Sequence, residues 1–445
     1  MKRKIRYGIS IGLTVAAAAL IFFSFGFGVF GDGFLPGADE VRAFLTDRQD
    51  RTDRGSDAAG DGAIAENQTG AGIPAGSRNR VVTPGVVSGQ AAAVSGPAVE
   101  EVPEEPVPET KSITISAVGD CSLGKLQIHG YSGSFLSYYD KYGPDYFFKN
   151  VKQYFSSDDL TLANLEGVLS TSDQKVEKKY NIEGPPEYTS ILTAAGIDLV
   201  GTGNNHIMDY GKQGAEDTWA ALDAAGIPYA YESKTALFTA ENGLKVGVVA
   251  AMCFNMGSDK EAAVKKSMDA LRSQGADLIV FMCHWGIEGN YTPEAGQVDF
   301  AHRIIDDGAD LFVGAHPHVL QGLEEYHGKM ILYSEGNFCF GGNRNPDDKD
   351  TMIYQQTFTF TDGVLQDGID AKVIPCRLSS RKDTNDFCPT PLSGSEGQAV
   401  LDKLNQISSG LGEEAVSLQA DGRVQAESRQ TADNAGEETT ENVQQ

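Results

Sequence analysis

Apolar segments with strand character alternate with helix-like segments through residues 111–391, and this alternation limits the chain to a layered α/β fold with mixed β-sheets. The first expected strands cover residues 113–118, 160–163, 197–200, 244–251, 277–283 and 310–313. The expected helices cover residues 187–195, 212–225, 260–273 and 293–307. From residue 320 only strands and turns follow, at residues 320–326, 330–334, 352–360 and 364–374. The sequence therefore predicts one folded domain over residues 111–391.

The segments outside this domain are poor in large apolar side chains, apart from the N-terminus. Residues 31–110 are rich in Gly, Ala and Ser and end in a run of Pro and Glu, which predicts a disordered tether. We expect residues 392–409 to form a short C-terminal helix or extension. Residues 410–445 are polar and acidic, and we expect them to be a disordered tail.

Residues 1–30 have the pattern of a membrane anchor. Four basic side chains precede an uncharged apolar stretch at residues 7–30, and about 20 apolar residues cross a bilayer as a helix. Basic residues beside a membrane span stay on the cytoplasmic side, so we expect the N-terminal end of this helix to face the cytoplasm. A cleavable signal peptide is the alternative, but no Ala-x-Ala motif follows Phe30. The prediction is a single-pass protein of the cell membrane, with its C-terminal domain extracytoplasmic.

Charge and cysteine spacing exclude two classes of function. The net charge is −26, and no basic patch is visible, so a nucleic-acid partner is not expected. The six cysteines show no CxxC pair and no zinc-finger spacing. A disulfide between Cys376 and Cys388 stays possible in an exported domain.

Residues of metal-binding type directly follow five of the expected strands. They are Asp120, Glu166, the triplet Asn204-Asn205-His206, His284, and the pair His316 and His318. Ligands collect at the carboxyl ends of strands in α/β sheets, so we expect these side chains to meet at one edge. Each has a structural explanation alone: a turn at Asp120, a helix cap at Asn205, a hydrogen-bonded histidine at position 284. Their joint occurrence favours a metal site.

The expected ligands are oxygen and nitrogen atoms without thiolate, which suits Mn, Fe, Zn or Mg. One or two divalent ions would fit, and a carboxylate that bridges two ions is typical of hydrolytic centres. A nearby histidine that does not bind metal could protonate a leaving group. Three histidines lie outside this set. We expect His302 and His327 to be structural or solvated, and His129 stays open.

The motifs around these residues resemble the CapA family of poly-γ-glutamate capsule biosynthesis proteins, which have a calcineurin-like metallophosphoesterase fold. Order and spacing match over residues 113–374. The matching segments are Gly119-Asp120, Asn164-Leu-Glu-Gly167, Asn204-Asn-His-x-x-Asp-Tyr-Gly211, His284-Trp-Gly-x-Glu288, Gly314-Ala-His-Pro-His-Val-Leu-Gln321 and Tyr333-Ser-x-Gly-Asn-Phe338. The resemblance therefore implies a metallophosphoesterase-like domain.

The resemblance also implies a role for each position. Asp120 and His318 would bind one metal, and Glu166 would bridge to a second metal held by three further ligands. These are Asn205, His284 and His316. His206 would be the catalytic histidine beside the leaving group. Further residues would contact substrate or hold hydrogen bonds behind the ligands: Asn164, Asn204, Asp209, Trp285, Glu288 and Asn337.

Three positions depart from the family pattern. Ser122 stands where the superfamily has a histidine two residues after the first aspartate, which weakens the first metal site. Ile182-Glu183 replaces the usual Phe-Arg, and the lost arginine weakens binding of an anionic substrate. Glu335 replaces an apolar residue, and the sequence offers no explanation for it.

The function implied is that of a membrane-anchored protein in the biosynthesis or export of poly-γ-glutamate, as capsule or surface polymer, with a metal-dependent hydrolase or transferase centre. The expected partners are an anionic surface polymer such as poly-γ-glutamate and subunits of a membrane synthase. Two alternatives stay open: a non-catalytic, polymer-binding accessory subunit of the synthase, and a secreted metal-dependent phosphoesterase. Fold by itself does not determine which of these applies.

Overall fold

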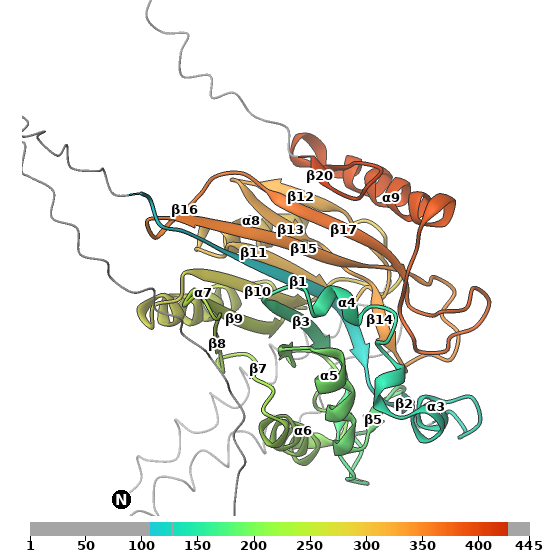
Figure 1. Cartoon of the computed structure of the whole chain (residues 1–445). Helices are drawn as coiled ribbons and strands as arrows, with labels where there is room; N and C mark the ends of the chain where they lie inside the picture. Colours follow the sequence, from blue (N-terminus) through green and yellow to red (C-terminus); the bar gives the residue numbers. More distant parts are fainter. Residues whose placement is uncertain (1–106, 127, 426–445) are drawn as a thin grey trace, which may run out of the picture. The chain divides into compact units, whose positions relative to one another are not determined.

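The computed structural model describes residues 107–126 and 128–425, which form a pair of β-sheets packed face to face (Figure 1). The nine-stranded sheet has the order β18 (Thr390–Pro391), β17 (Asp370–Arg377), β15 (Asp350–Thr361), β1 (Thr110–Ser122), β3 (Leu160–Leu165), β6 (Leu199–Gly201) and β7 (Tyr229–Ala230). Two further strands pair at its side, β14 (Asn337–Phe340) with β1 and β16 (Val364–Leu365) with β15. The predicted mixed sheet is present, because β1 is parallel to β3 and antiparallel to β15.

The six-stranded sheet has the order β12 (Leu323–Tyr326), β13 (Lys329–Leu332), β11 (Leu311–Ala315), β10 (Leu278–His284), β9 (Lys245–Met252) and β8 (Ala236–Thr239). Its central strands β9, β10 and β11 are parallel to one another, as β1, β3 and β6 are in the other sheet. Two smaller sheets contain further strands. One has the order β2 (Lys125–Leu126), β5 (Ile182–Gly184) and β4 (Val168–Leu169), and the other pairs β19 (Ser417–Leu418) with β20 (Val424–Gln425).

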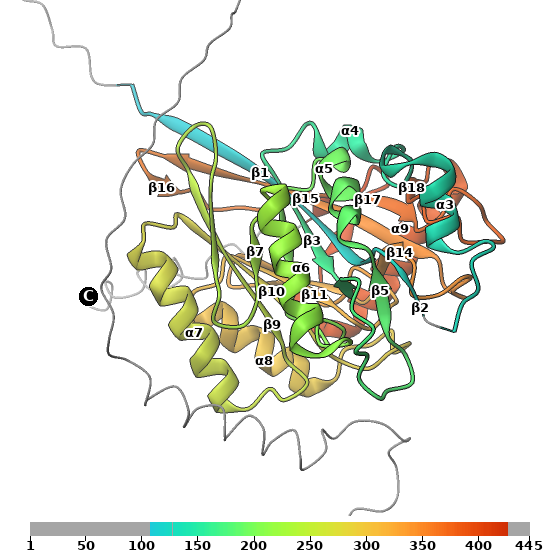
Figure 2. The same ribbon diagram turned by 90° about the horizontal axis from the view of Figure 1, so that it is seen from below.

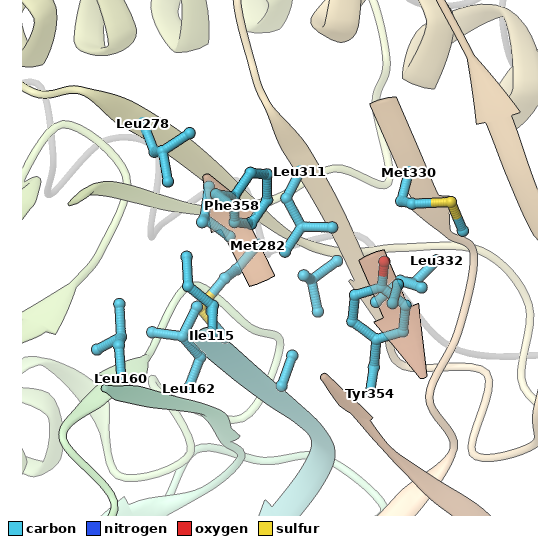
Figure 3. Close-up of a cluster of buried hydrophobic side chains, with 14 of the residues drawn as sticks. Ile115, Leu160, Leu162, Leu278, Met282, Leu311, Met330, Leu332, Tyr354 and Phe358 are labelled. Carbon is cyan, nitrogen blue, oxygen red and sulfur yellow. The ribbon is translucent and has the colours of Figure 1, made fainter. Parts of the chain in front are cut away.

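The main hydrophobic core lies between the two sheets. Strand side chains alternate in direction, so every second residue of β1, namely Ile113, Ile115 and Ala117, faces this core. Figure 3 shows Ile115 of β1 and Leu162 of β3 beside side chains of the opposite sheet. The next residue, Val118, points the other way and belongs to the core on the outer face of the sheet. Because side chains alternate in direction along the strand, β1 contributes to the cores on both of its faces.

Helices cover both outer faces (Figure 2). The nine-stranded sheet packs against α3 (Phe135–Tyr142), α4 (Lys152–Phe155), α5 (Thr189–Ala195) and α6 (Gly211–Ala225). The six-stranded sheet packs against α7 (Ser258–Ser273) and α8 (Ala295–Asp306). Three short 3₁₀ segments are η1 (Pro144–Tyr146), η2 (Pro186–Tyr188) and η3 (Ser409–Glu414). On α7 the buried Val264, Met268 and Leu271 recur at helical spacing, which is the amphipathic pattern expected for a covering helix.

The C-terminal end of the domain extends further than the sequence predicted. The expected short helix is present as α9 (Gly394–Ser408), which contacts β17 of one sheet and β12 of the other. The prediction that disorder begins at residue 410 is wrong, because η3, β19 and β20 follow. Val416, Leu418 and Val424 are buried in the inter-sheet core, which explains why so polar a segment folds. Residues 426–445 lie outside the described residues.

Other boundaries also differ from expectation. The expected strand at residues 364–374 is two strands, β16 and β17, and α3, β8 and β14 were not predicted. The expected turn at Asp362-Gly363 is present, with positive φ at both residues. Cys376 and Cys388 carry free, buried thiols, so the possible disulfide is not formed.

The predicted anchor at residues 1–30 and most of the tether at residues 31–110 lie outside the described residues. Within residues 107–126 and 128–425, no helix combines the length and apolarity needed to cross a membrane.

Candidate metal centre

The carboxyl ends of strands from both sheets meet at one place and carry the predicted ligands. In the nine-stranded sheet, Asp120 lies on β1, Glu166 directly follows β3, and Asn205 lies in the turn after β6. In the six-stranded sheet, His284 ends β10, and the pair His316 and His318 follows β11. The expectation of a single sheet edge is therefore corrected: two facing sheets supply the site, because their parallel strands end on the same side.

A close backbone approach holds the first of these ends in place. The Asp120 N–H donates to Gly336 O at 2.9 Å, and Asp120 pairs with Asn337 at the start of β14. A Cβ atom at position 119 would lie 2.0 Å from Gly336 O, so only glycine allows β1 to approach the Gly336 backbone this closely. His316 and His318 both have positive φ, at 100° and 59°, a strained conformation that turns both residues toward the site.

Glu166 is the centre of the cluster. The residue is fully buried, and its Oε2 accepts a hydrogen bond from Ser122 Oγ at 3.0 Å. Its Oε1 accepts none, although buried polar atoms are almost always paired. Three imidazole nitrogens face this oxygen at 3.8–3.9 Å: His206 Nε2, His284 Nε2 and His318 Nε2. An orphaned carboxylate oxygen among imidazoles fits a divalent cation.

Two sets of three ligands could hold an ion here, with all ligand atoms of a set within 4.8 Å of one another. One set is Asp120, Glu166 and His284, and the other is Glu166, His316 and His318. Glu166 belongs to both sets, as a bridging carboxylate does in a two-metal centre.

The pKa values of the histidines divide them into two kinds. Burial and the neighbouring His316 hold the pKa of His284 well below its usual value. Burial and His318 lower the pKa of His316 to about 3, so both imidazoles are neutral and offer lone pairs. Burial also disfavours charge on His318, but Glu166 and Asp120 outweigh it and raise its pKa to about 10. Burial and Asp120 raise the pKa of Glu166. A cation that binds here therefore displaces a proton from the Glu166–His318 pair.

The structure brings Asn164, Asn204 and Asn337 into one hydrogen-bond network with the candidate ligands. Asn164 Nδ2 donates to Asp120 Oδ1 at 2.7 Å and lies 3.1 Å from His284 Nδ1. Asn204 Nδ2 donates to Asn164 Oδ1 at 3.3 Å. Asn337 Oδ1 lies 2.9 Å from His318 Nδ1, which is also 3.2 Å from Asp120 Oδ2. His284 Nε2 lies 2.8 Å from Asn205 Oδ1 and 3.0 Å from His316 Nδ1. The ligands are thus tied to one another by a continuous network.

His206 is oriented by residues on two loops. Its Nδ1–H donates to Asp209 Oδ2 at 2.7 Å, so Nε2 is the nitrogen directed at Glu166. Lys178 forms an ion pair with Asp209 and donates to Asn205 O at 3.1 Å. The sequence reasoning missed Lys178, because it lies in an irregular loop without a pattern that points to the site.

Two of the predicted neighbours have other environments. Trp285 donates its indole N–H to Tyr333 O at 2.9 Å and packs against Phe312 in the core beneath α8, so it supports the sheet rather than facing the ligands. Glu288 is exposed, and its charge helps to raise the pKa of His318. A further neighbour, Phe254, contacts the His316 ring with 4.6 Å between centroids. Phe254 follows an expected strand, as the ligands do. Its side chain is apolar, so a search for metal-binding residue types does not select it.

The comparison with known proteins agrees with this geometry. Residues 114–342 match the family described as bacterial capsule synthesis protein PGA_cap, and this segment contains every predicted ligand. The chain belongs to this family. The resemblance to CapA proteins is thereby confirmed.

Three curated relatives are similar to this chain, and two of them are named CapA. A capsule biosynthesis protein CapA of Bacillus anthracis is 31% identical over 52% of this chain and 61% of the relative. A PGA biosynthesis protein CapA of Bacillus subtilis is 29% identical over 51% of this chain and 63% of the relative. A probable polyglutamine synthesis accessory protein of Mycobacterium tuberculosis is 29% identical over 50% of this chain and 66% of the relative. The matched segments thus span less than two thirds of each relative's length.

Proposed function

We propose that this protein acts in the biosynthesis or export of poly-γ-glutamate or a similar anionic surface polymer, by means of a divalent-metal centre. The observation that carries the metal centre is Glu166 Oε1, a buried oxygen without a hydrogen bond that faces three imidazoles. The polymer is proposed from the names of the relatives from the two Bacillus species.

Six residues would hold one or two ions of Mn, Fe, Zn or Mg: Asp120, Glu166, Asn205, His284, His316 and His318. A bound ion of this kind polarises an acyl or phosphoryl oxygen and activates water. His284 and His316 are neutral and ready to bind. The proton on the Glu166–His318 pair must leave first, which makes binding stronger as the pH rises.

His206 is the residue placed to move a proton. Asp209 holds its Nδ1–H, so Nε2 faces the site beside Glu166 and can deliver a proton to a leaving group. Lys178 forms an ion pair with Asp209 and donates to Asn205 O, so it helps to hold the carboxylate that orients His206. The reaction proposed is hydrolysis or transfer at an acyl or phosphoryl centre.

The first test measures the metal content of the purified full-length protein and its turnover of a substrate panel. The panel contains γ-linked polyglutamate and a chromogenic phosphodiester, each with added manganese. We expect metal-dependent turnover of the polymer that disappears in His206→Ala and His284→Ala, with His327→Asn as the control outside the site. Turnover of the phosphodiester alone would favour a secreted phosphoesterase, and turnover that survives both alanine variants would refute the catalytic centre.

A second function, that of a non-catalytic accessory subunit, is favoured by Ser122. Its hydroxyl donates to Glu166 Oε2 at 3.0 Å, where an imidazole would instead add a metal ligand. The mycobacterial relative also carries the word accessory in its name. In this case the protein would bind the emerging polymer or a membrane synthase subunit.

Polymer export in cells separates the two functions. An accessory role predicts that His284→Ala leaves export intact, whereas a catalytic role predicts its loss. The proposed anchor at residues 1–30 is tested in the same cells: its deletion should release the protein from the membrane fraction and abolish export. Protease protection in intact cells should show an extracytoplasmic C-terminal domain if the proposed topology holds.

A further inference from the structure

A short loop, residues 176–182, lies against the turn that carries His206, and Asp209 holds it there. The Asn181 side-chain amide donates to Asp209 O at 3.0 Å, and the Ile182 N–H donates to Asp209 Oδ2 at 2.6 Å. Asp209 is fully buried, and its Oδ2 also accepts from His206 Nδ1. One carboxylate therefore fixes both the loop and the histidine that faces the candidate metal centre.

Two consecutive lysines of this loop have opposite environments. Lys178 is turned inward, where its ammonium donates to Asn205 O at 3.1 Å and forms an ion pair with Asp209. Lys179 is exposed, and its ammonium lies over the Tyr180 ring, 4.8 Å from the centroid. Within the part of the chain that the structure describes, Lys179 forms no ion pair with a carboxylate. Its charge is therefore open to an anionic ligand.

Lys179 lies at the mouth of the candidate metal centre. The ammonium of the residue before it in the chain lies 3.4 Å from His206 Nδ1. Tyr180 and, to a smaller extent, Glu288 raise the pKa of Lys179, and Glu288 also contributes to the raised pKa of His318. The same carboxylate thus acts on the exposed lysine and on a proposed metal ligand.

Exposed apolar side chains lie beside the same mouth. Met208, Phe254 and Ile287 are 40%, 43% and 48% exposed, respectively. Phe254 contacts the His316 ring, and Met208 and Ile287 each lie within three residues of an imidazole of the site. Exposed apolar side chains gathered beside a few polar groups are typical of a ligand-binding surface. This surface suits a chain that carries both methylene groups and anionic groups, because a small inorganic anion would leave the apolar side chains uncovered.

We propose that Lys179 is a specificity residue, which binds a carboxylate of a polycarboxylate chain whose methylene segments lie on Met208, Phe254 and Ile287. Each unit of γ-linked polyglutamate carries a free carboxylate and a methylene segment, so this polymer has the required chemistry. The contact is a charge-assisted hydrogen bond, and the Tyr180 ring restricts the ammonium before the ligand arrives. This inference rests on the proposed function and names the residue that selects its anionic substrate.

The test measures binding of a fluorescently labelled γ-linked polyglutamate oligomer to the full-length protein with Mn²⁺, by fluorescence anisotropy. We expect Lys179→Ala to weaken binding by about fivefold, the effect of one exposed ion pair, and Lys179→Arg to stay within about twofold. The loss should shrink at about 0.5 M salt, because salt screens exposed charges. Lys266→Ala is the matched control. It removes the same charge from an exposed position of α7, and affinity should stay unchanged.

A second ligand separates recognition of the carboxylate from a structural effect. The same oligomer with its carboxylates converted to amides should bind the unaltered protein and Lys179→Ala equally. If Lys179→Ala also weakens binding of the amidated oligomer, Lys179 supports the loop and the proposal is overturned.

Failure of this inference and failure of the proposed function have different signatures. If the unaltered protein does not bind the polyglutamate oligomer, the polymer assignment of the proposed function fails and this inference fails with it. If the unaltered protein binds the oligomer and Lys179→Ala binds it as tightly, this inference alone is overturned. An equal loss in Lys266→Ala would also overturn it, because the effect would then come from net charge.

Discussion

Two clusters of histidine and carboxylate in this protein have similar composition and opposite hydrogen bonding. The first is the candidate metal centre around Glu166. The second, here called the His302 cluster, consists of His302 on α8, Glu324 on β12, Tyr333 and Glu414. In both, ligand atoms of one histidine and two carboxylates lie within 4.8 Å of one another. Residue types and distances alone therefore do not distinguish the two.

Hydrogen bonding does distinguish them. Glu324 Oε1 lies 2.9 Å from His302 Nε2, and Tyr333 Oη donates to Glu324 Oε2 at 2.5 Å, so both buried oxygens are paired. The His302 ring also stacks on Tyr326 at 3.8 Å between centroids. Glu166 Oε1, by contrast, accepts no hydrogen bond. A paired carboxylate stabilises the fold, whereas an unpaired buried one gains stability from a cation. Between these two clusters, the unpaired carboxylate oxygen is therefore the feature that separates a candidate metal site from a structural cluster.

The largest expected effect is on metal affinity. His284→Ala removes an imidazole from the metal centre, and we expect it to weaken Mn²⁺ or Zn²⁺ binding by at least about 100-fold. His302→Ala should leave the affinity unchanged, because its partner Glu324 is already paired without a cation. Isothermal titration of both variants measures the difference. Equal loss in the two would show that the His302 cluster also binds metal.

The next effect is on folding stability at the His302 cluster. Glu324→Gln replaces a buried charged acceptor of two hydrogen bonds, and we expect the free energy of unfolding to fall by about 1.5–3 kcal/mol. Urea denaturation measures this change, with the exposed Glu241→Gln as control. Metal affinity should stay constant in both variants, and a loss in Glu324→Gln would break the distinction between the clusters.

Removal of metal by a chelator should reveal how the metal centre responds to pH. His318, with its pKa raised to about 10, adds stability that is full below pH 6.5 and is lost as the pH rises toward 10. His316, with its pKa lowered to about 3, adds stability that is full above pH 6.5 and is lost as the pH falls toward 3. Denaturation across this range should show maximum stability near pH 6.5. A His318→Gln variant that kept the alkaline decline would contradict this assignment.

The smallest effect is expected beside the His302 cluster, at His327. Its ion pair with Asp306 measures 3.1 Å, but both side chains are mostly exposed. We expect His327→Asn to change the free energy of unfolding by less than about 0.5 kcal/mol, because solvent screens such pairs and asparagine tolerates the positive φ of 49°. A thermal melt measures this, and a large shift would extend the structural cluster to the surface.

Much of the candidate metal centre was predictable from the sequence, because each ligand lies close to the end of its own strand along the chain. Asp120, Glu166, His284 and His316 each lie at or just after the end of an apolar run, and parallel strands carry such residues to one side. Lys178 and Phe254 were not predictable by this reasoning. Lys178 reaches the site from an irregular loop, and Phe254 is apolar, so neither follows a periodic pattern.

The C-terminal segment shows where local composition misleads. Residues 410–425 contain few apolar side chains, and their sequence predicted disorder. Yet Val416, Leu418 and Val424 are buried in the core, and Leu323 N–H donates to Ser408 Oγ at 2.9 Å beside them. Burial of each such side chain contributes about 1.5–3 kcal/mol, so packing against an existing core favours order in a segment whose overall composition is polar.

The sequence by itself determined the layered α/β class, the alternating faces of the strands and the residue types that follow them. These features depend on residues that are close in sequence. The two-residue period of strands and the 3.6-residue period of helices can therefore be read from the sequence. Only the tertiary structure decided that two sheets share the site, and that Glu324 is hydrogen-bonded while Glu166 Oε1 is not. Hydrogen bonding of a buried atom depends on residues far apart in the chain, and no local pattern records whether a partner arrives.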